Sequence, residues 1–158
     1  MIPSRMTKSF PDSLVVVSLD GQSIALDAAR VERIVEAVAI APLPGAPAGV
    51  RGVVNFQGTL VPVFDPRLRF GLPERELRAT DHLVFAHGAT RLVALLVEGV
   101  VDVIEADSGR LVPSEAILPS LPVIEGVMKL NGDLVFIYDL DRFLSAEGER
   151  ELSATLPG

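Results

Sequence analysis

The chain has 158 residues, enough to bury a core as one domain or as two small subdomains. It contains no cysteine, which excludes disulfide bonds, thiolate nucleophiles and cysteine-based zinc sites and suits a reducing cytoplasm. A formal net charge of -7 argues against nucleic acid as a partner, because binding a phosphate backbone requires clustered lysine and arginine. Charged residues and prolines interrupt every apolar run before it reaches membrane-spanning length, and no apolar segment of a signal peptide follows the amino terminus.

Short runs rich in β-branched residues dominate the chain and predict a mainly β fold. The expected strands are residues 14–19, 34–40, 60–64, 83–86, 92–97, 100–104 and 134–138. Helical signals are confined to residues 27–31, to the turns after Asp65 and Asp139, and to a tail at 145–156.

Turn and loop signals separate these runs. Asp20-Gly21 and Asn131-Gly132 readily adopt the positive φ angles of a type I′ hairpin, so tight hairpins are expected at both places. Two proline-rich stretches, residues 42–47 and 113–122, predict connecting loops because proline lacks the N–H that a sheet ladder requires.

The most informative feature is an internal repeat. Residues 50–70 align without a gap with residues 124–144, and residues 24–37 resemble residues 93–106. Six positions of the first alignment are identical: Gly52/Gly126, Val53/Val127, Gly58/Gly132, Leu60/Leu134, Val61/Val135 and Asp65/Asp139. The chain is therefore duplicated, and two copies of a five-stranded unit predict two small β-barrels, since short curled sheets protect their edges by closing.

Candidates for catalysis are few. Asp65 and Asp139 occupy matching repeat positions and could act as a carboxylate pair in a small hydrolase. The alternative is that each aspartate ends a strand and caps the helical turn that follows, which we favour because neither has a protease-like Asp-Thr-Gly or Asp-Ser-Gly sequence. Two histidines, His82 and His87, offer no metal-binding spacing. We expect no metal, no cofactor and no enzymatic activity.

Residues 50–65, VRGVVNFQGTLVPVFD, resemble the central signature of CheW-domain proteins, x-R-G-x-x-N-L-R-G-x-x-x-P-V-x-D. Other landmarks of that family occur in order, among them Gly21-Gln22, Ala25-Leu26, Val31-x-x-Ile34, the PLPGAP loop and the closing GDLVFIYDLDRFL. The resemblance covers residues 14–144, with an internal duplication at approximately 14–79 and 80–144, a flexible amino terminus at 1–13 and a helical or frayed tail at 145–158.

The resemblance implies two five-stranded SH3-like barrels and a non-catalytic chemotaxis adaptor. Such an adaptor binds the cytoplasmic tip of a methyl-accepting chemoreceptor and the regulatory domain of a CheA-type histidine kinase, in the cytoplasm beside membrane-anchored receptor arrays. It implies no nucleic acid and no membrane insertion. A divergent CheW-like module of a non-motility signalling pathway is the further alternative.

The resemblance also implies site residues. It assigns Val31, Arg51 and Gly52 to the kinase-facing surface, where Gly52 would let a partner's backbone approach closely. It implies an apolar groove for the receptor where the barrels meet, with candidates Ile34, Val35, Val97 and Val100, bordered by Arg33 and Gln57. Arg33 and Gln57 depart from the family pattern, which commonly has an acidic residue and an arginine at these positions, so we expect them to change which receptor is accepted.

Overall fold

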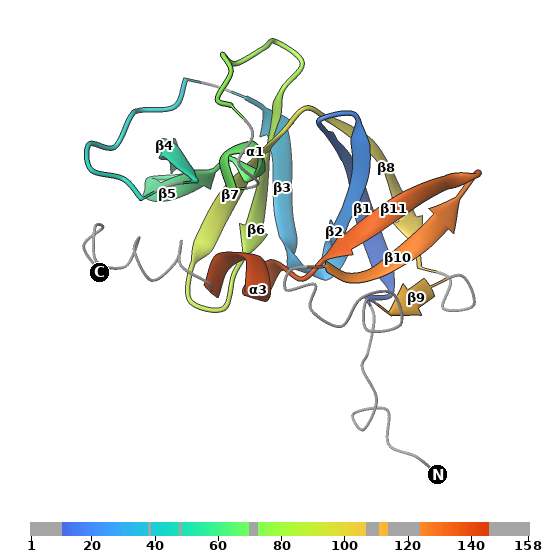
Figure 1. Cartoon of the computed structure of the whole chain (residues 1–158). Helices are drawn as coiled ribbons and strands as arrows, with labels where there is room; N and C mark the ends of the chain where they lie inside the picture. The colour runs from blue at the N-terminus through green and yellow to red at the C-terminus, as the bar shows by residue number, and fades with distance from the viewer. Residues whose placement is uncertain are drawn as a thin grey trace.

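The computed structural model describes residues 11–37, 39–47, 49–69, 73–106, 111–113 and 124–145 (Figure 1). Within them the first half of the chain forms β1 (Ser13–Leu19), β2 (Gln22–Asp27), β3 (Val31–Glu36), β4 (Val50–Phe56) and β5 (Thr59–Phe64). The second half forms β6 (His82–His87), β7 (Leu92–Val97), β8 (Gly99–Glu105), β9 (Leu111–Pro113), β10 (Ile124–Leu130) and β11 (Asp133–Tyr138). The helices are short: η2 (Ala28–Arg30), α1 (Pro66–Arg69) and α3 (Leu140–Ser145). The mainly β prediction is confirmed.

The strands form two sheets, and each sheet takes strands from both halves of the chain. The six-stranded sheet has the order β8-β1-β2-β11-β10-β9, and the five-stranded sheet has the order β3-β6-β7-β5-β4. Figure 1 shows the two sheets beside each other, with α3 below their junction. We refer to them as the six-stranded barrel and the five-stranded barrel.

The repeat equates strands β1 to β5 with β6, β7, β8, β10 and β11, in that order. With these equivalences the two sheets have the same strand order, apart from the additional β9. The hairpin β1–β2 of the first half lies between β8 and β11 of the second half, and the hairpin β6–β7 lies between β3 and β5 of the first half. The repeat halves therefore do not each form one barrel; they exchange their first two strands.

The repeated hairpins β4–β5 and β10–β11 have the same register. Val50 pairs with Phe64 and Gly52 with Val63, while Ile124 pairs with Tyr138 and Gly126 with Ile137, so both hairpins have a β-bulge at the same position. Both also turn through positive φ angles of the same size, at residues 57–58 and 131–132. The predicted equivalence of residues 50–70 and 124–144 is confirmed for the parts that the structure describes.

Three apolar clusters hold the molecule together. One lies inside the five-stranded barrel and includes Val61, Leu83 and Phe85, and another lies inside the six-stranded barrel and includes Leu14 and Val135. The third is the largest and joins both sheets to α3, with members such as Val15, Val17, Phe64, Val84, Leu95, Phe143 and Leu144. Alternate residues of β1, β6 and β7 thus face a barrel interior or the junction, so these strands are apolar on both sides.

Some predicted boundaries were wrong. The strand expected at 34–40 is β3, which begins at Val31 and ends at Glu36, and β2, β4, β9 and β10 were not among the expected runs. β2, β4 and β10 contain polar residues or glycine, such as Arg51 and Gly52 in β4, and this hides their apolar alternation. β9 is only three residues long and ends in Pro113, at the start of a stretch that was predicted as a loop. Most of the expected amino-terminal segment, residues 1–10 of 1–13, and most of the expected tail lie outside the described residues, and Ser13 already belongs to β1.

The exchange predicts that neither half of the chain folds alone. A fragment of residues 1–79 lacks the β6–β7 hairpin at the centre of its sheet, and a fragment of residues 80–158 lacks β1–β2. We expect each fragment to lack a cooperative unfolding transition, because most of its apolar surface would stay exposed. Circular dichroism of each fragment and of an equimolar mixture tests this; a cooperative transition in either fragment by itself would contradict it.

Candidate protein interaction surface

Arg51 lies on β4 in an ionic network rather than at an open surface. Its Nη1 donates to Oδ2 of Asp65 at 2.8 Å, its Nε lies 3.0 Å from Glu74, and its Nη2 donates to the carbonyl oxygen of Arg75. The Arg51 side chain is 12% exposed and that of Asp65 is 1% exposed. Arg51 therefore ties β4 to the end of β5 and to the loop that follows α1.

The network continues through a second buried carboxylate. Arg75 forms two hydrogen bonds with Asp81, which is fully buried, and the backbone N–H of Arg78 donates to the same carboxylate. Burial by itself would raise the pKa of Asp81, but Arg75 and Arg78 outweigh it and hold the pKa below its usual value. Arg75 also lies 3.6 Å from Glu98, the single residue between β7 and β8.

Two ion pairs lie where the chain crosses from one barrel to the other. Glu98, at the β7–β8 crossing, pairs with Arg67 of α1 at 3.2 Å, and Arg67 also contacts Asp20. Arg30, at the β2–β3 crossing, forms two hydrogen bonds with Asp141 of α3, at 2.6 and 2.5 Å. The Arg30 guanidinium holds the pKa of the Asp141 carboxyl below its usual value.

Gly52 is covered by the protein's own backbone. A Cβ atom added at this position would lie 2.1 Å from the carbonyl oxygen of Ala41, which forms a β-bridge with Val53. The expectation that Gly52 admits a partner's backbone is corrected to this extent: the close neighbour is the PLPGAP loop region of the same chain.

Arg33 and the turn at Gln57 lie close together at the edge of the five-stranded barrel. The Arg33 guanidinium lies over the Phe56 ring, 5.8 Å from its centroid, and Phe56 stacks on Phe85 at 4.2 Å. Gln57 follows Phe56, is exposed and has a φ of 54° in the β4–β5 turn. The structure therefore brings together the two residues that depart from the family pattern.

The apolar candidates separate into three kinds. Val31 and Ile34 are half-buried against the junction cluster, and Val35 is half-buried against the interior of the five-stranded barrel. Val97 is 1% exposed, so its side chain belongs to the core. The expectation that Val97 contacts a receptor was therefore wrong. Val100 is 38% exposed, but it lies on β8 at the edge of the other sheet and pairs with Val17.

The sequence reasoning missed the exposed neighbours of Val100. Val101 and Val103 on β8 are 56% and 59% exposed, and with Val100 they form an apolar strip on an edge strand of the six-stranded sheet. Val101 is the extra residue of a bulge, because Val100 and Asp102 pair with consecutive residues of β1. The run 100–104 was predicted as a strand, and nothing in its composition distinguishes these exposed valines from buried ones.

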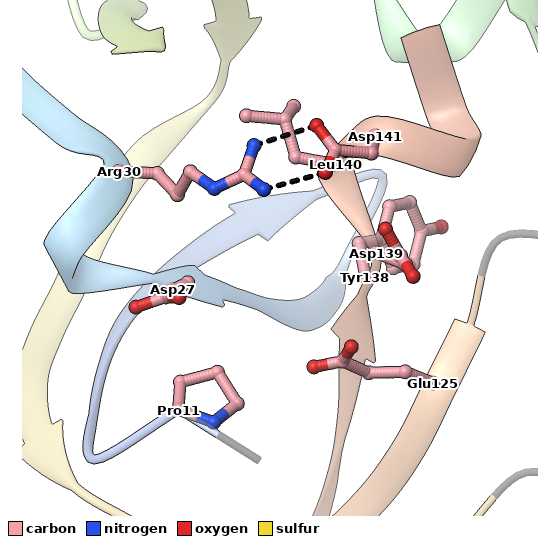
Figure 2. Close-up of a pocket in the computed structure, with 8 residues that line it drawn as sticks. All are labelled: Pro11, Asp27, Arg30, Glu125, Tyr138, Asp139, Leu140 and Asp141. Carbon is pink, nitrogen blue, oxygen red and sulfur yellow. Dashed lines mark hydrogen bonds and ion pairs between the residues drawn. The ribbon is translucent and has the colours of Figure 1, made fainter. Parts of the chain in front are cut away.

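A polar cavity of about 280 Å³ opens beside the β2–β3 crossing. Figure 2 shows Pro11 and Asp27 on one side and Glu125, Tyr138 and Asp139 on the other, with the Arg30–Asp141 pair above them, across the top of the view. Burial raises the pKa of Tyr138 to about 12, so its phenol stays protonated at physiological pH. The lining carries four carboxylates and one guanidinium, and it belongs to the junction of β2, β10, β11 and α3.

Both symmetric aspartates cap helical turns, as expected. Asp65 Oδ1 accepts from the N–H of Arg67 at 3.1 Å, and Asp139 Oδ1 accepts from the N–H of Arg142 at 3.2 Å. Asp65 also holds Arg51, whereas the corresponding partner position of Asp139 is occupied by Glu125. Their surroundings therefore differ, and each carboxylate is engaged at its own helical turn.

Comparison with known proteins identifies the family. The model of the CheW-like domain matches residues 13–148. The chain belongs to the CheW-like domain family. It is 30% identical over 112 residues to "Chemotaxis protein CheW" of Rhizobium meliloti, covering 70% of this chain and 72% of that protein. It is 25% identical over 141 residues to the protein of the same name from Bacillus subtilis, covering 88% and 90%.

A solved structure has the same fold. The scaffolding protein TtCheW from Thermoanaerobacter tengcongensis superposes with a TM-score of 0.77 at 26% identity, covering 88% of this chain and 96% of that one. The two SH3-like barrels and the resemblance drawn from residues 50–65 are thereby confirmed. The CheW-like family consists of non-catalytic chemotaxis scaffolds, which removes the hydrolase alternative for Asp65 and Asp139. In the described ranges no helix is long and apolar enough to span a membrane.

Gly52 provides a test of the internal contact. Replacing Gly52 with Ala should lower the free energy of unfolding by about 2 kcal/mol or more, because Ala41 must move away from the new Cβ. Gly99→Ala is the control, since its nearest neighbour, the Ser18 Oγ, lies 3.6 Å away. Urea unfolding measures the free energy of unfolding of both variants. Equal values would contradict the close packing of Ala41 against Gly52.

The symmetric aspartates should differ in their contribution to stability. Asp65→Asn keeps a cap but removes the buried charge that pairs with the partly buried Arg51, at a cost of about 3 kcal/mol. Asp139→Asn should cost less than about 1 kcal/mol, because asparagine caps nearly as well and the ion-pair partner of Asp139, Arg142, is exposed. The two unfolding free energies measure the difference, and a larger loss at Asp139 would reverse the assignment.

Proposed function

We propose that this CheW-like scaffold couples the cytoplasmic tip of a methyl-accepting chemoreceptor to the regulatory domain of a CheA-type histidine kinase. The observation that carries the proposal is the pair of edge strands β3 and β8, which belong to different barrels and are each joined through a short crossing to the opposite barrel. Two partners bound at these edges would be held in one geometry. Under this proposal the protein works in the cytoplasm beside receptor arrays.

The receptor surface that we propose combines a charged part and an apolar part. Arg33, supported by Phe56, and Gln57 form the charged border on the five-stranded barrel. Ile34 and Val35 are the half-buried apolar residues of the same strand. On the other barrel, Val101 and Val103 join Val100 as apolar contacts in place of the buried Val97.

The kinase surface remains centred on the first half of the chain. Val31, at the start of β3, is the candidate for direct contact, since it is only partly buried. Arg51 and Gly52 would act indirectly: Arg51 anchors the β4–β5 hairpin through Asp65, and Gly52 lets Ala41 pack against it. Their substitution would then alter kinase binding by displacing the hairpin.

The proposed mechanism involves no chemical step. A receptor bound across both barrels changes conformation, and the scaffold transmits its position to the kinase held near the start of β3. The populations of the active and inactive kinase then shift. The size of the shift is limited by the difference between the free energies with which the receptor-bound scaffold binds these two kinase states. A junction with a large shared core favours this role, because it keeps the barrels in a fixed relation.

Arg33 should set receptor preference. We expect Arg33→Glu to weaken binding to the cognate receptor tip about tenfold and to strengthen binding to a receptor suited to the usual acidic residue, since charges at the rim of an interface tune partner choice. Isothermal titration of both proteins with both receptor tips, at low and moderate salt, measures this.

Phe56→Leu is the matched control, because it removes the ring below Arg33 and keeps the charge. It should reduce affinity for the cognate tip without reversing the preference. Equal affinities in all combinations of protein and receptor would remove Arg33 from the site. Failure of both the wild-type protein and its variants to bind any receptor tip or kinase regulatory domain would refute the proposed function itself.

A further inference from the structure

Because the chain is duplicated, each of two similar hairpins could pack into either barrel. The hairpins β4–β5 and β10–β11 share their register, their bulge and their turn geometry, and each fits beside a parallel strand that has a counterpart in the other barrel. In the structure β11 lies beside β2 and β5 lies beside β7. The opposite assignment, with β5 beside β2, would form the same kinds of sheet.

The connecting segments do not prevent the opposite assignment. Thirteen residues, 37–49, separate β3 from β4, and seventeen residues, 65–81, separate β5 from β6. An extended segment of thirteen residues spans about 40 Å, which exceeds the width of a small barrel. Something other than chain length must therefore place each hairpin in its own barrel.

The charges at the hairpin ends are reversed between the repeats. Arg67 of α1 corresponds to Asp141 of α3, and Arg51 corresponds to Glu125. The ends of the receiving strands are reversed in the same sense, because β7 is followed by Glu98 and β2 is followed by η2, which contains Arg30.

The observed pairing of the strands brings opposite charges together at both places. Because β2 and β11 run in parallel, their carboxyl ends adjoin, and Arg30 meets Asp141 at 2.6 and 2.5 Å. Because β7 and β5 run in parallel, Glu98 meets Arg67 at 3.2 Å. The opposite assignment would bring Arg30 to Arg67 and Glu98 to Asp141, which are like charges in partly buried surroundings.

We propose that Arg30, Arg67, Glu98 and Asp141 form a charge code that assigns each of the two similar hairpins to its barrel. Attraction stabilises the native assignment, and repulsion between like charges raises the free energy of the alternative. The code acts at the two crossings, where the barrels are joined, so it also fixes the relation between them.

The experiment exploits the absence of cysteine from the chain. Ser23 on β2 lies opposite Val135 on β11, and the repeat counterpart of Val135 is Val61 on β5. The pair Ser23→Cys with Val135→Cys therefore reports the native assignment, and Ser23→Cys with Val61→Cys reports the opposite one. Val61 and Val135 are equally buried, which makes the two reporters comparable.

Each reporter is placed in three charge backgrounds: the natural one, an interchanged one with Arg67→Asp and Asp141→Arg, and a compensated one that adds Arg30→Asp, Glu98→Arg and Asp20→Asn. The last substitution is needed because Asp20 is the second partner of residue 67. Each protein is unfolded in denaturant, refolded under reducing conditions and then oxidised, and the intramolecular disulfide is quantified by mass spectrometry. In the natural background we expect only the 23–135 disulfide.

In the interchanged background the ratio of the 23–61 to the 23–135 disulfide should rise at least tenfold. Compensation should lower it again at least fivefold, short of the natural value because Arg75 then faces an arginine at position 98. A ratio that changes less than twofold on interchange would overturn the proposal, because apolar packing alone would then choose the hairpin. Should the interchanged protein fail to fold, the compensated protein decides: native cross-linking there supports the charge code, and failure to fold refutes it.

Discussion

The shortness of the two crossings between barrels is the constraint on which the architecture depends. Three residues join β2 to β3 and one residue joins β7 to β8. The place beside β2 is taken by β11 and the place beside β7 by β5, so a third strand could stay in the same sheet only on the far side of the hairpin, parallel to β2 or β7. Such a parallel connection needs roughly a dozen residues or more. Neither linker is long enough, so each chain half must send its third strand into the other barrel.

Exchange explains the unusual apolarity of the central strands. The hairpins β1–β2 and β6–β7 each have one face in a barrel interior and the other at the junction, and the alternate residues of β1 divide between the two clusters. The junction core is larger than either barrel core and includes α3. A scaffold built this way resists separation of its barrels, because parting them would expose that core and pull on the two short crossings.

Local signals in the sequence predicted the hairpins well, but they could not predict which strands pair across the two halves of the chain. Asp20-Gly21 and Asn131-Gly132 form turns at positive φ, and the repeat correctly equated two hairpins. Exchange leaves the same local pattern as independent barrels, so periodicity could not reveal it. The predicted site residues were partly wrong for the same reason. Val97 and Val101 are both valines in apolar runs, and only the structure shows that Val97 faces the core and Val101 faces solvent.

The family signature acts largely within the fold. Arg51 pairs with Asp65, Gly52 makes room for Ala41, and Pro62 occupies a buried position on β5, so these residues of the signature shape one hairpin and anchor its end. Its repeat counterpart keeps the glycine and the aspartate but replaces the arginine with Glu125. The two barrels thus share a backbone plan while differing in charge where they meet. Asymmetry of this kind lets one duplicated fold offer two different surfaces, as the proposed coupling of a receptor to a kinase would require.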